Sequence, residues 1–233
     1  LIKRNTKQLI ITSDGMAVYA TAKKILSLWG NIKDPTKRND KKEKISIGMF
    51  DNAALKLASF FSKKNAIQFE MIIDSSKKLQ QYVKQGLLDI CICVVNIQNK
   101  QLSETNLIYT TEETLVPVSS KKWSSNIKEI PFILYNSNSE TRNYIDYTFQ
   151  KNNINPIIVA QSTSTSFMKE LAINGIGVAL LPKNFVDSEI KEKRLFIQKL
   201  PFEWKRTIGL YLPKGGSLPS ESKLISHVWS YFK

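Results

Sequence analysis

The sequence predicts an α/β fold built from two Rossmann-like subdomains, preceded by a separate linker helix. Three observations lead to this prediction. From residue 45 onward, short apolar runs alternate with segments of helical period, which is the order of a parallel sheet covered by helices. Residues 90–95 are apolar throughout, as expected for a strand covered on both faces. Ser, Thr, Asn or Asp stands before most helical segments, and Gly follows several, so the element boundaries can be placed.

The first thirty residues predict a basic β-hairpin that leads into an amphipathic helix. Two apolar stretches, residues 1–2 and 9–11, flank a cationic tip. Thr12 is a good N-cap, and Asp14 places a negative charge in the first helical turn. A cationic hairpin beside a helix is the build of a winged DNA-binding element. Its candidate phosphate contacts are Lys3, Arg4 and Lys7. A solvated hairpin that touches nothing explains these residues about equally well on their own.

A flexible linker and then the first Rossmann-like unit are expected next. Residues 31–44 are polar and basic, which predicts the linker after a helix over 15–30. Strands are predicted over 44–50, 68–73 and 90–95. Helices are predicted to begin at Asp51 or Asn52 and at residues 74–76, the second ending at Gly86. This β-α-β-α-β order implies a parallel sheet with right-handed crossovers.

The second unit repeats the pattern after a strand at 114–118. Pro117 lies inside that strand, which indicates an edge strand or a crossover between subdomains. Further strands are predicted at 132–135, 156–160, 177–181, 195–200 and 207–212. Helices are predicted between the first three of these strands, and a last one covers 222–232. The chain is therefore expected to hold two similar α/β units joined by two crossovers.

The charge of the chain suggests an anionic partner. Its 233 residues carry a net charge of +14, and residues 1–44 hold eleven Lys or Arg against four Asp or Glu. This uneven excess favours nucleic acid at the N-terminal end, although a Lys-, Asn- and Ile-rich composition also reflects AT-rich coding. No apolar run is long enough to span a bilayer and no signal peptide is present, so we expect a cytoplasmic protein without membrane contact.

Catalytic chemistry is poorly supported by the sequence. Cys91 and Cys93 share one strand face and have no His nearby, so we interpret them as small buried side chains. His227 is the only histidine. Gly175 and Gly177 end a helix and enter a strand, the reverse of a nucleotide-binding loop. We therefore expect no catalytic residue, no metal site and no cofactor.

Polar clusters at the starts of predicted helices are better candidates for a binding site. They lie where the carboxyl ends of strands meet helix N-termini, the usual ligand position in open α/β sheets. Free N–H groups, hydroxyls and the helix dipole together suit a small anion. The candidates of this kind are Asn52, Ser75, Ser137, Ser139, Thr141 and Ser164. Each could simply cap its own helix, and only their convergence on one cleft favours a ligand over that explanation.

Three segments of the chain resemble sequence motifs of the LysR-type transcription regulators of bacteria. Residues 1–15 resemble the end of that family's winged helix-turn-helix, with Ile2 in place of the usual aromatic residue and Ile11 in place of Leu. Residues 79–92 and 171–182 resemble two phrases of its effector domain. The likeness spans essentially the whole chain. It implies the type II periplasmic-binding-protein fold.

The resemblance also implies a domain organisation. Residues 1–14 would be a remnant of the wing, and 15–30 the linker helix that pairs in a dimer. The effector domain would cover 45–233. Its first subdomain would comprise about 45–116 and 213–233, and its second about 117–212. Since a helix-turn-helix precedes the wing in the family, we expect a fragment of a longer regulator.

The resemblance further implies a ligand-responsive regulator that binds DNA and forms dimers or tetramers. A small, anionic effector would bind in the cleft between the subdomains. The residues that match the family's contact positions are Phe50, Asn52, Ala53, Ser75, Ser139 and Thr141. Val94 stands where a hydroxyl residue is frequent, so a partly apolar effector is expected. The alternative is a solute-binding protein of the same fold that serves transport, which would carry a signal peptide and no wing.

Overall fold

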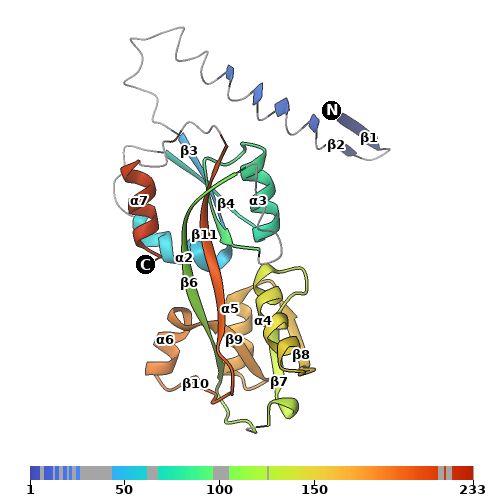
Figure 1. The fold of residues 1–233 in the computed structure, drawn as a ribbon, viewed down its shortest axis with the longest axis vertical. Helices are drawn as coiled ribbons and strands as arrows, with labels where there is room; N and C mark the ends of the chain where they lie inside the picture. The colour runs from blue at the N-terminus through green and yellow to red at the C-terminus, as the bar shows by residue number, and fades with distance from the viewer. Residues whose placement is uncertain are drawn as a thin grey trace.

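The computed structural model describes residues 1–5, 8–12, 14–15, 18–19, 21–22, 25–26, 44–61, 68–96, 105–124, 126–214, 218 and 222–232. The predicted hairpin is present, since β1 (Ile2–Asn5) pairs antiparallel with β2 (Gln8–Ile11). The described residues between 14 and 26 are helical, and they lie apart from the main body in Figure 1. Lys7 and the predicted linker 31–43 lie outside the described residues.

One continuous sheet of nine strands runs through the rest of the protein. The strands are β3 (Lys44–Met49), β4 (Gln68–Ile73), β5 (Ile90–Val94), β6 (Thr105–Ser119), β7 (Pro131–Tyr135), β8 (Ile157–Ser162), β9 (Val178–Pro182), β10 (Phe196–Ile197) and β11 (Trp204–Pro213). Their order is β4-β3-β5-β11-β6-β9-β7-β8, with β10 paired to β6. The strands β4, β3 and β5 are parallel, as are β8, β7 and β9, whereas β6 and β11 run antiparallel to their neighbours.

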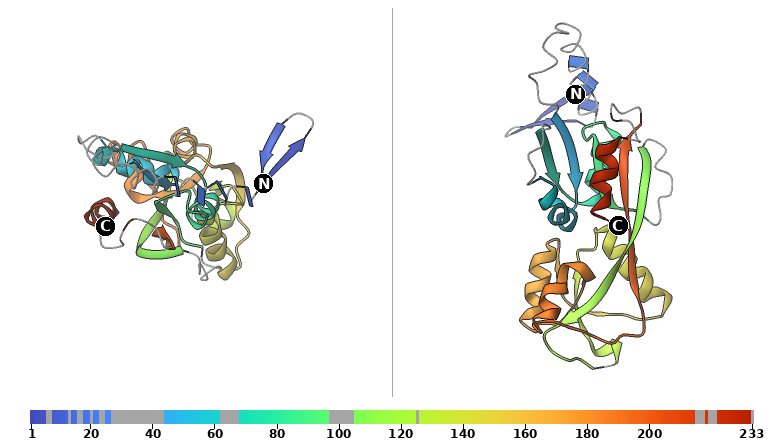
Figure 2. Two further views of the ribbon diagram at one scale, coloured as in Figure 1. Left: turned by 90° about the horizontal axis from the view of Figure 1, so that it is seen from above. Right: turned by 90° about the vertical axis from the view of Figure 1, so that its left-hand side faces the viewer.

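Six helices of the described chain cover this sheet. They are α2 (Asp51–Phe61), α3 (Ser76–Lys84), α4 (Glu140–Lys151), α5 (Thr165–Ile173), α6 (Lys183–Lys191) and α7 (Lys223–Ser230), with a short 3₁₀ turn, η2 (Ile127–Glu129). Two lobes result, and β6 and β11 are the long strands that cross from one lobe to the other (Figures 1 and 2). The α/β prediction and the double crossover are confirmed.

Each lobe has its own apolar core. The first is formed by β3, β5, α2 and α7, where Ile47, Leu57 and Val228 are fully buried. The second is formed by β7, β9, α4 and α5, where the rings of Phe132 and Phe149 meet at 5.2 Å. The strands β6 and β11 contribute to both. The two lobes are therefore separately packed bodies that share two strands.

Two predicted strands differ from those observed. The segment predicted at 114–118 is the end of β6, which begins nine residues earlier, at Thr105. The segment predicted over 195–200 pairs only at Phe196–Ile197. Gln198 still donates its backbone N–H to Pro117 O at 2.8 Å, but Pro117 has no N–H to extend the pairing further. The side-chain amide of Gln198 donates to Lys121 O at 3.0 Å instead of facing a strand.

Candidate functional site

Arg206 of β11 is the charged group at the junction of the two lobes. Arg206 is buried, with only 2% of its surface exposed. Its Nε and Nη2 donate to Oε2 of Glu113, the facing residue of β6, at 2.9 and 2.6 Å. Its Nη1 donates to Oγ1 of Thr141, in the first turn of α4, at 2.5 Å. The guanidinium carbon lies 5.0 Å from the ring centre of Phe50 and 6.0 Å from that of Tyr135. One side chain thus touches elements of both lobes.

Lys56, in α2 of the first lobe, is the second cation of this ion cluster. Lys56 of α2 donates from Nζ to Oε1 of Glu113 at 2.8 Å. Burial alone would raise the pKa of Glu113, but the charges of Arg206 and Lys56 outweigh it and hold the pKa below its ordinary value. Glu113 is therefore a carboxylate at neutral pH. Asn52 precedes Lys56 by four residues, so both lie on the same face of α2.

A hydrogen bond at the start of α4 also links the lobes. Asn96, which follows β5 in the first lobe, donates from Nδ2 to Oε1 of Glu140 at 3.1 Å. The other carboxylate oxygen of Glu140 accepts from Asn143 at 3.0 Å. Together with the bond from Arg206 to Thr141, this contact holds the N-terminus of α4 against the first lobe.

Three buried groups at the junction keep hydrogen-bonding capacity that no described residue uses. Nδ2 of Asn52 has no partner. Oη of Tyr135 has Thr165 as a polar neighbour, but makes no hydrogen bond of good geometry. Arg206 makes three hydrogen bonds within the described chain, whereas a guanidinium has five N–H groups. A buried polar group without a partner costs about 1–3 kcal/mol, so this set is typical of a site that receives a ligand.

The structure brings four of the predicted site residues to this junction. Phe50 and Thr141 contact Arg206 directly. Asn52 and Ala53 follow Phe50 in the first turn of α2 and are buried. These residues come from both lobes, as the resemblance implied.

The remaining four predicted residues are placed differently. Ser75 and Ser137 are exposed, and Ser139 stands before α4 without capping it through its side chain. Ser164 accepts a hydrogen bond from Phe167 N at 3.3 Å, so it caps its own helix. Beside Ser75, the buried Ser76 accepts from Val94 N at 3.0 Å and points inward instead.

The sequence prediction missed the charges of the site. Arg206, Glu113 and Lys56 were not among the candidates, nor was Tyr135. One signal could have found Arg206. It stands between Trp204 and Ile208 at alternate positions of β11, and all three side chains are buried. An Arg on the inward face of a strand is rare unless it is paired.

The DNA-contact candidates belong to the hairpin. Lys3 and Arg4 lie in β1, with Ile10 and Leu9 as their partners in β2. Lys3 is exposed. Lys7 lies outside the described residues, so the structure does not show the three cations together.

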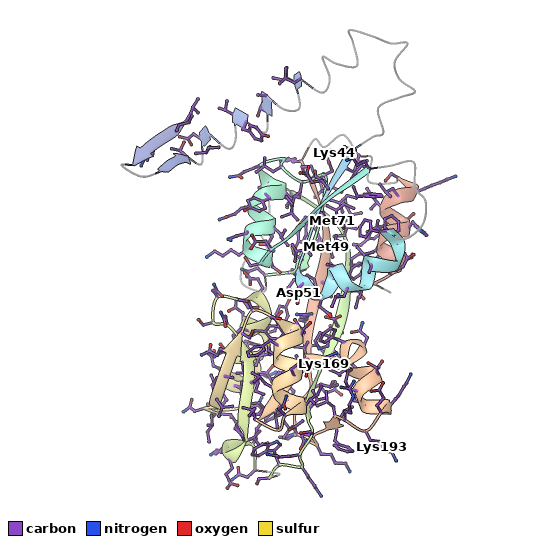
Figure 3. All side chains as sticks on the ribbon, turned by 180° about the vertical axis from the view of Figure 1, so that it is seen from behind. Lys44, Met49, Asp51, Met71, Lys169 and Lys193 are labelled. Carbon is purple, nitrogen blue, oxygen red and sulfur yellow. The ribbon has the colours of Figure 1, made fainter. Side chains whose placement is uncertain are left out.

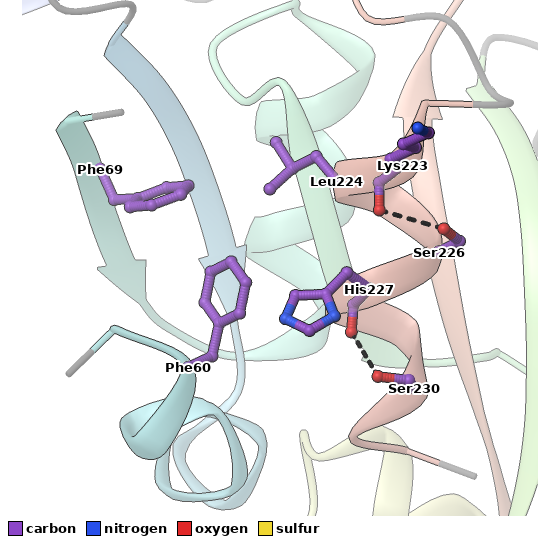
Figure 4. A pocket seen from close by; sticks show the side chains of 7 residues that line it. All are labelled: Phe60, Phe69, Lys223, Leu224, Ser226, His227 and Ser230. Carbon is purple, nitrogen blue, oxygen red and sulfur yellow. Dashed lines mark hydrogen bonds between the residues drawn. The ribbon is translucent and has the colours of Figure 1, made fainter. Parts of the chain in front are cut away.

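A groove of about 640 Å³ lies elsewhere, between α2, β4 and α7 of the first lobe (Figure 4). It is lined by three apolar side chains, Phe60, Phe69 and Leu224, and by four polar residues of α7, Lys223, Ser226, His227 and Ser230. The hydroxyls of Ser226 and Ser230 donate to carbonyls of their own helix, at 3.0 and 2.6 Å. Its hydroxyls are thus already used, unlike the donors at the junction.

Other kinds of site find little support in the described residues. Among them, no cluster of three or more His, Cys, Asp or Glu side chains could hold a metal ion. Cys91 and Cys93 are free thiols and fully buried, as expected from their spacing. No helix in the described part is long and apolar enough to span a bilayer.

Comparison with known proteins agrees with this arrangement. Three solved structures share the fold. The bromide-bound regulatory domain of HypT from Salmonella typhimurium has a TM-score of 0.65 at 16% identity, covering 83% of this chain and 95% of that one. DarR of Vibrio fischeri, solved in complex with DNA, has a TM-score of 0.63 at 17% identity, covering 99% and 82%. ArgP of Mycobacterium tuberculosis has a TM-score of 0.72 at 13% identity, covering 99% and 80%.

A search of curated proteins gave no match. The family model for the LysR substrate binding domain matches residues 39–232, which is most of the chain. This match confirms the resemblance and favours a regulator over a transport protein. The chain therefore belongs to the LysR substrate binding domain family.

Proposed function

We propose that a small anion is the effector of this LysR-type regulator and that it binds at the junction around Arg206. The observation that carries the proposal is the set of unused donors on Asn52, Tyr135 and Arg206, which are buried between two lobes. Burial raises the pKa of the Tyr135 hydroxyl, so this group stays a protonated donor at neutral pH. HypT, with the same fold, was solved with bromide bound, which supports an anion.

Binding at this place would be coupled to the relative position of the lobes. A ligand that takes Nη1 of Arg206 competes with Thr141, and one that enters beside α4 competes with the bond from Asn96 to Glu140. Both bonds link the lobes, so the ligand changes which arrangement is favoured. The strands β6 and β11 cross the junction and contribute to both cores, and we infer that they act as the hinge.

The hairpin gives the proposed link to DNA. DarR of the same fold was solved in complex with DNA. We infer that Lys3, Arg4 and Lys7 contact phosphates and that the protein works in the cytoplasm, with binding rather than catalysis as its activity. The family match is to a regulator family, which fits this role.

Self-association is supported by two kinds of exposed apolar surface. The helical residues Val18, Ile25 and Leu26 are at least half exposed, as expected of a linker helix that pairs with a second copy. The two end strands of the sheet, β4 and β8, also expose apolar side chains, which are Met71, Ile73, Ile157 and Val159. A two-fold axis would bring β4 of each copy to β8 of the other, which covers both edges.

A ligand screen with matched variants tests the proposed site. The purified chain is scanned for thermal stabilisation with a panel of small acids, and binders are measured by calorimetry. Asn52→Ala and Tyr135→Phe should weaken the binder by about tenfold or more, since each removes an unused donor that would bond to a charged group. Ser137→Ala, at an exposed position, is the control and should bind as wild type. A binder that is insensitive to both junction variants would contradict the proposed site.

A further inference from the structure

We infer that the far end of the second lobe is a docking surface for an acidic, extended segment of a partner protein, which adds to β10 as a strand. The surface consists of β10 and of four exposed lysines beside it, called here the distal lysine patch: Lys121, Lys122, Lys193 and Lys199. It lies at the end of the second lobe that faces away from the first, where Figure 3 labels Lys193. The inference is therefore independent of the effector site at the junction.

Two chain segments are held together at this end by the side chain of Gln198. Its amide nitrogen donates to Lys121 O at 3.0 Å, and its amide oxygen accepts from Trp123 N at 3.1 Å. The end of β6 also faces β10 directly, since Ser119 pairs with Phe196. The lysines that follow β6 and those that flank β10 thus belong to one surface.

The distal lysine patch carries positive charge that is not neutralised from within its own segments. Residues 119–123 and 193–199 contain no Asp or Glu. None of the four lysines forms an ion pair with a residue that the structure describes. Exposed like charges that lie close together attract an anionic partner.

The acids beside these segments are mostly taken by other cations. Three of them act on Arg194, the remaining cation of the two segments. Glu192 binds Arg194 at 2.8 Å, and Glu189 binds Lys169 at 2.6 Å and Arg194 at 3.5 Å. The third, Glu170, is exposed and pairs with no cation in the described part of the chain. One free acid thus stands against four lysines, and the surface keeps a positive surplus.

Between these lysines, β10 has a free strand edge. Its outer side pairs with no other strand of the described chain. Phe196 pairs with Ser119, and Gln198 N donates to Pro117 O at 2.8 Å, so the N–H and C=O of Ile197 between them point away from β6. Phe196 and Ile197 are 49% and 46% exposed, which leaves the edge open and apolar. An open edge of this kind can bind an extended peptide through main-chain hydrogen bonds.

These features favour a protein segment over nucleic acid. Phosphate groups could use the lysines, but a phosphate diester has no donor for the C=O of Ile197 and no apolar surface for the side chains of β10. A segment in which acidic and β-branched residues alternate matches the lysines, the strand edge and the apolar side chains together.

Fluorescence anisotropy with short labelled peptides tests the inference on the purified chain. The probe alternates Glu and Val. One control alternates Lys and Val, and a second carries two adjacent prolines at the centre of the Glu–Val sequence, which cannot form the ladder. The probe should bind in a salt-dependent manner, and both controls should bind at least about tenfold more weakly.

Matched variants locate the binding. Lys122→Glu combined with Lys199→Glu should weaken the Glu–Val peptide by about tenfold or more, because two attractive charges become repulsive. Lys151→Glu, at an exposed position at the end of α4, is the control and should bind as wild type. Ile197→Pro removes the outward N–H and should also weaken binding. If that variant does not fold, the proline-containing peptide decides the same question.

Two kinds of result would overturn the inference. Absence of binding at millimolar peptide, or binding that the double lysine variant leaves unchanged, excludes the distal lysine patch as the docking surface. Equally tight binding of the proline-containing peptide, or of a single-stranded DNA of the same charge, excludes strand addition and reduces the patch to a general anion-binding surface.

Discussion

Glu113 accepts hydrogen bonds from cations of two elements, Lys56 in α2 and Arg206 in β11. Taking three charges out of water is costly, and only their mutual contacts offset that cost. Removing the negative charge leaves two buried cations facing each other. The cluster therefore fixes the geometry of the junction, and its stability should depend on pH.

We expect Glu113→Gln to lower the free energy of unfolding by about 3 kcal/mol at neutral pH, the cost of breaking a buried ion pair from one side. The pKa of Glu113 is lowered by folding, so its contribution is complete above the unfolded pKa of about 4.3 and is lost as pH falls through the lower folded value. Urea unfolding from pH 7 to pH 3 should show this loss in wild type and a smaller loss in the variant. Glu112→Gln should follow wild type, and a variant with an unchanged pH profile would contradict the cluster's role.

At this scale the sequence predicted neutral polar residues better than charged ones. Asn52 and Thr141 could be found because a helix start after a strand has a known geometry. Arg206 and Glu113 could not be paired in advance, because 93 positions separate them and only the register of β6 with β11 joins them. Ser164 has a local role in the structure, since its hydroxyl accepts the capping bond of α5, and its contact with an effector stays a prediction.

The ends of two elements lie at positions that favour glycine. Gly177 lies just before β9 and close to the neighbouring strand β7. A Cβ added at this position would lie 2.5 Å from the carbonyl oxygen of Pro131, at the start of β7. Backbone cannot move aside as a side chain can. Gly86 ends α3 at φ +69°, in open space. The two glycines are required for different reasons, and substitutions can tell them apart.

Gly177→Ala should destabilise the protein by about 1–3 kcal/mol, the usual cost of overpacking. Gly86→Asn should cost less than 1 kcal/mol, because Asn tolerates the left-handed region and meets no neighbour. Thermal unfolding of both variants measures the difference. Equal losses would mean that the contact with Pro131 relaxes freely.

Element order could be predicted from hydrophobic period, whereas the length of β6 could not. Only its last five residues are mostly apolar, and all five are buried, with Leu115, Val116 and Val118 in the second core. Its first ten, Thr105 to Thr114, are mostly polar and partly exposed, yet they pair with β11 along its length. These residues form a strand because β11 pairs with them, and the hydrophobic pattern of the segment itself does not reveal that pairing.

At the scale of the whole molecule, the two end strands should mediate association of effector domains. Met71→Lys in β4 and Val159→Lys in β8 place charges on the apolar edges and should shift sedimentation toward smaller species. Leu107→Lys, an equally exposed residue of the inner strand β6, should not. Unchanged sedimentation of both edge variants would exclude these strands as the interface.

The hairpin should give weak, salt-dependent binding to DNA without sequence preference. Phosphate contacts release counterions, so affinity falls as salt rises. Replacing Lys3, Arg4 and Lys7 with Ala should flatten that dependence by about two to three units of slope. Fluorescence anisotropy with random duplexes measures it, with Lys151→Ala at the end of α4 as the control. A preference for one duplex over others would contradict non-specific contact.

The shared strands also set the order in which the protein can fold during synthesis. The second core is built mainly from a continuous stretch, from Leu115 to Trp204. The first core needs both ends of the domain, since Ile45 of β3 packs in the same cluster as Phe232 after α7. A ribosome releases the N-terminal part long before that partner exists. The second lobe can thus be complete while the first, made earlier, still waits for the last residues of the chain.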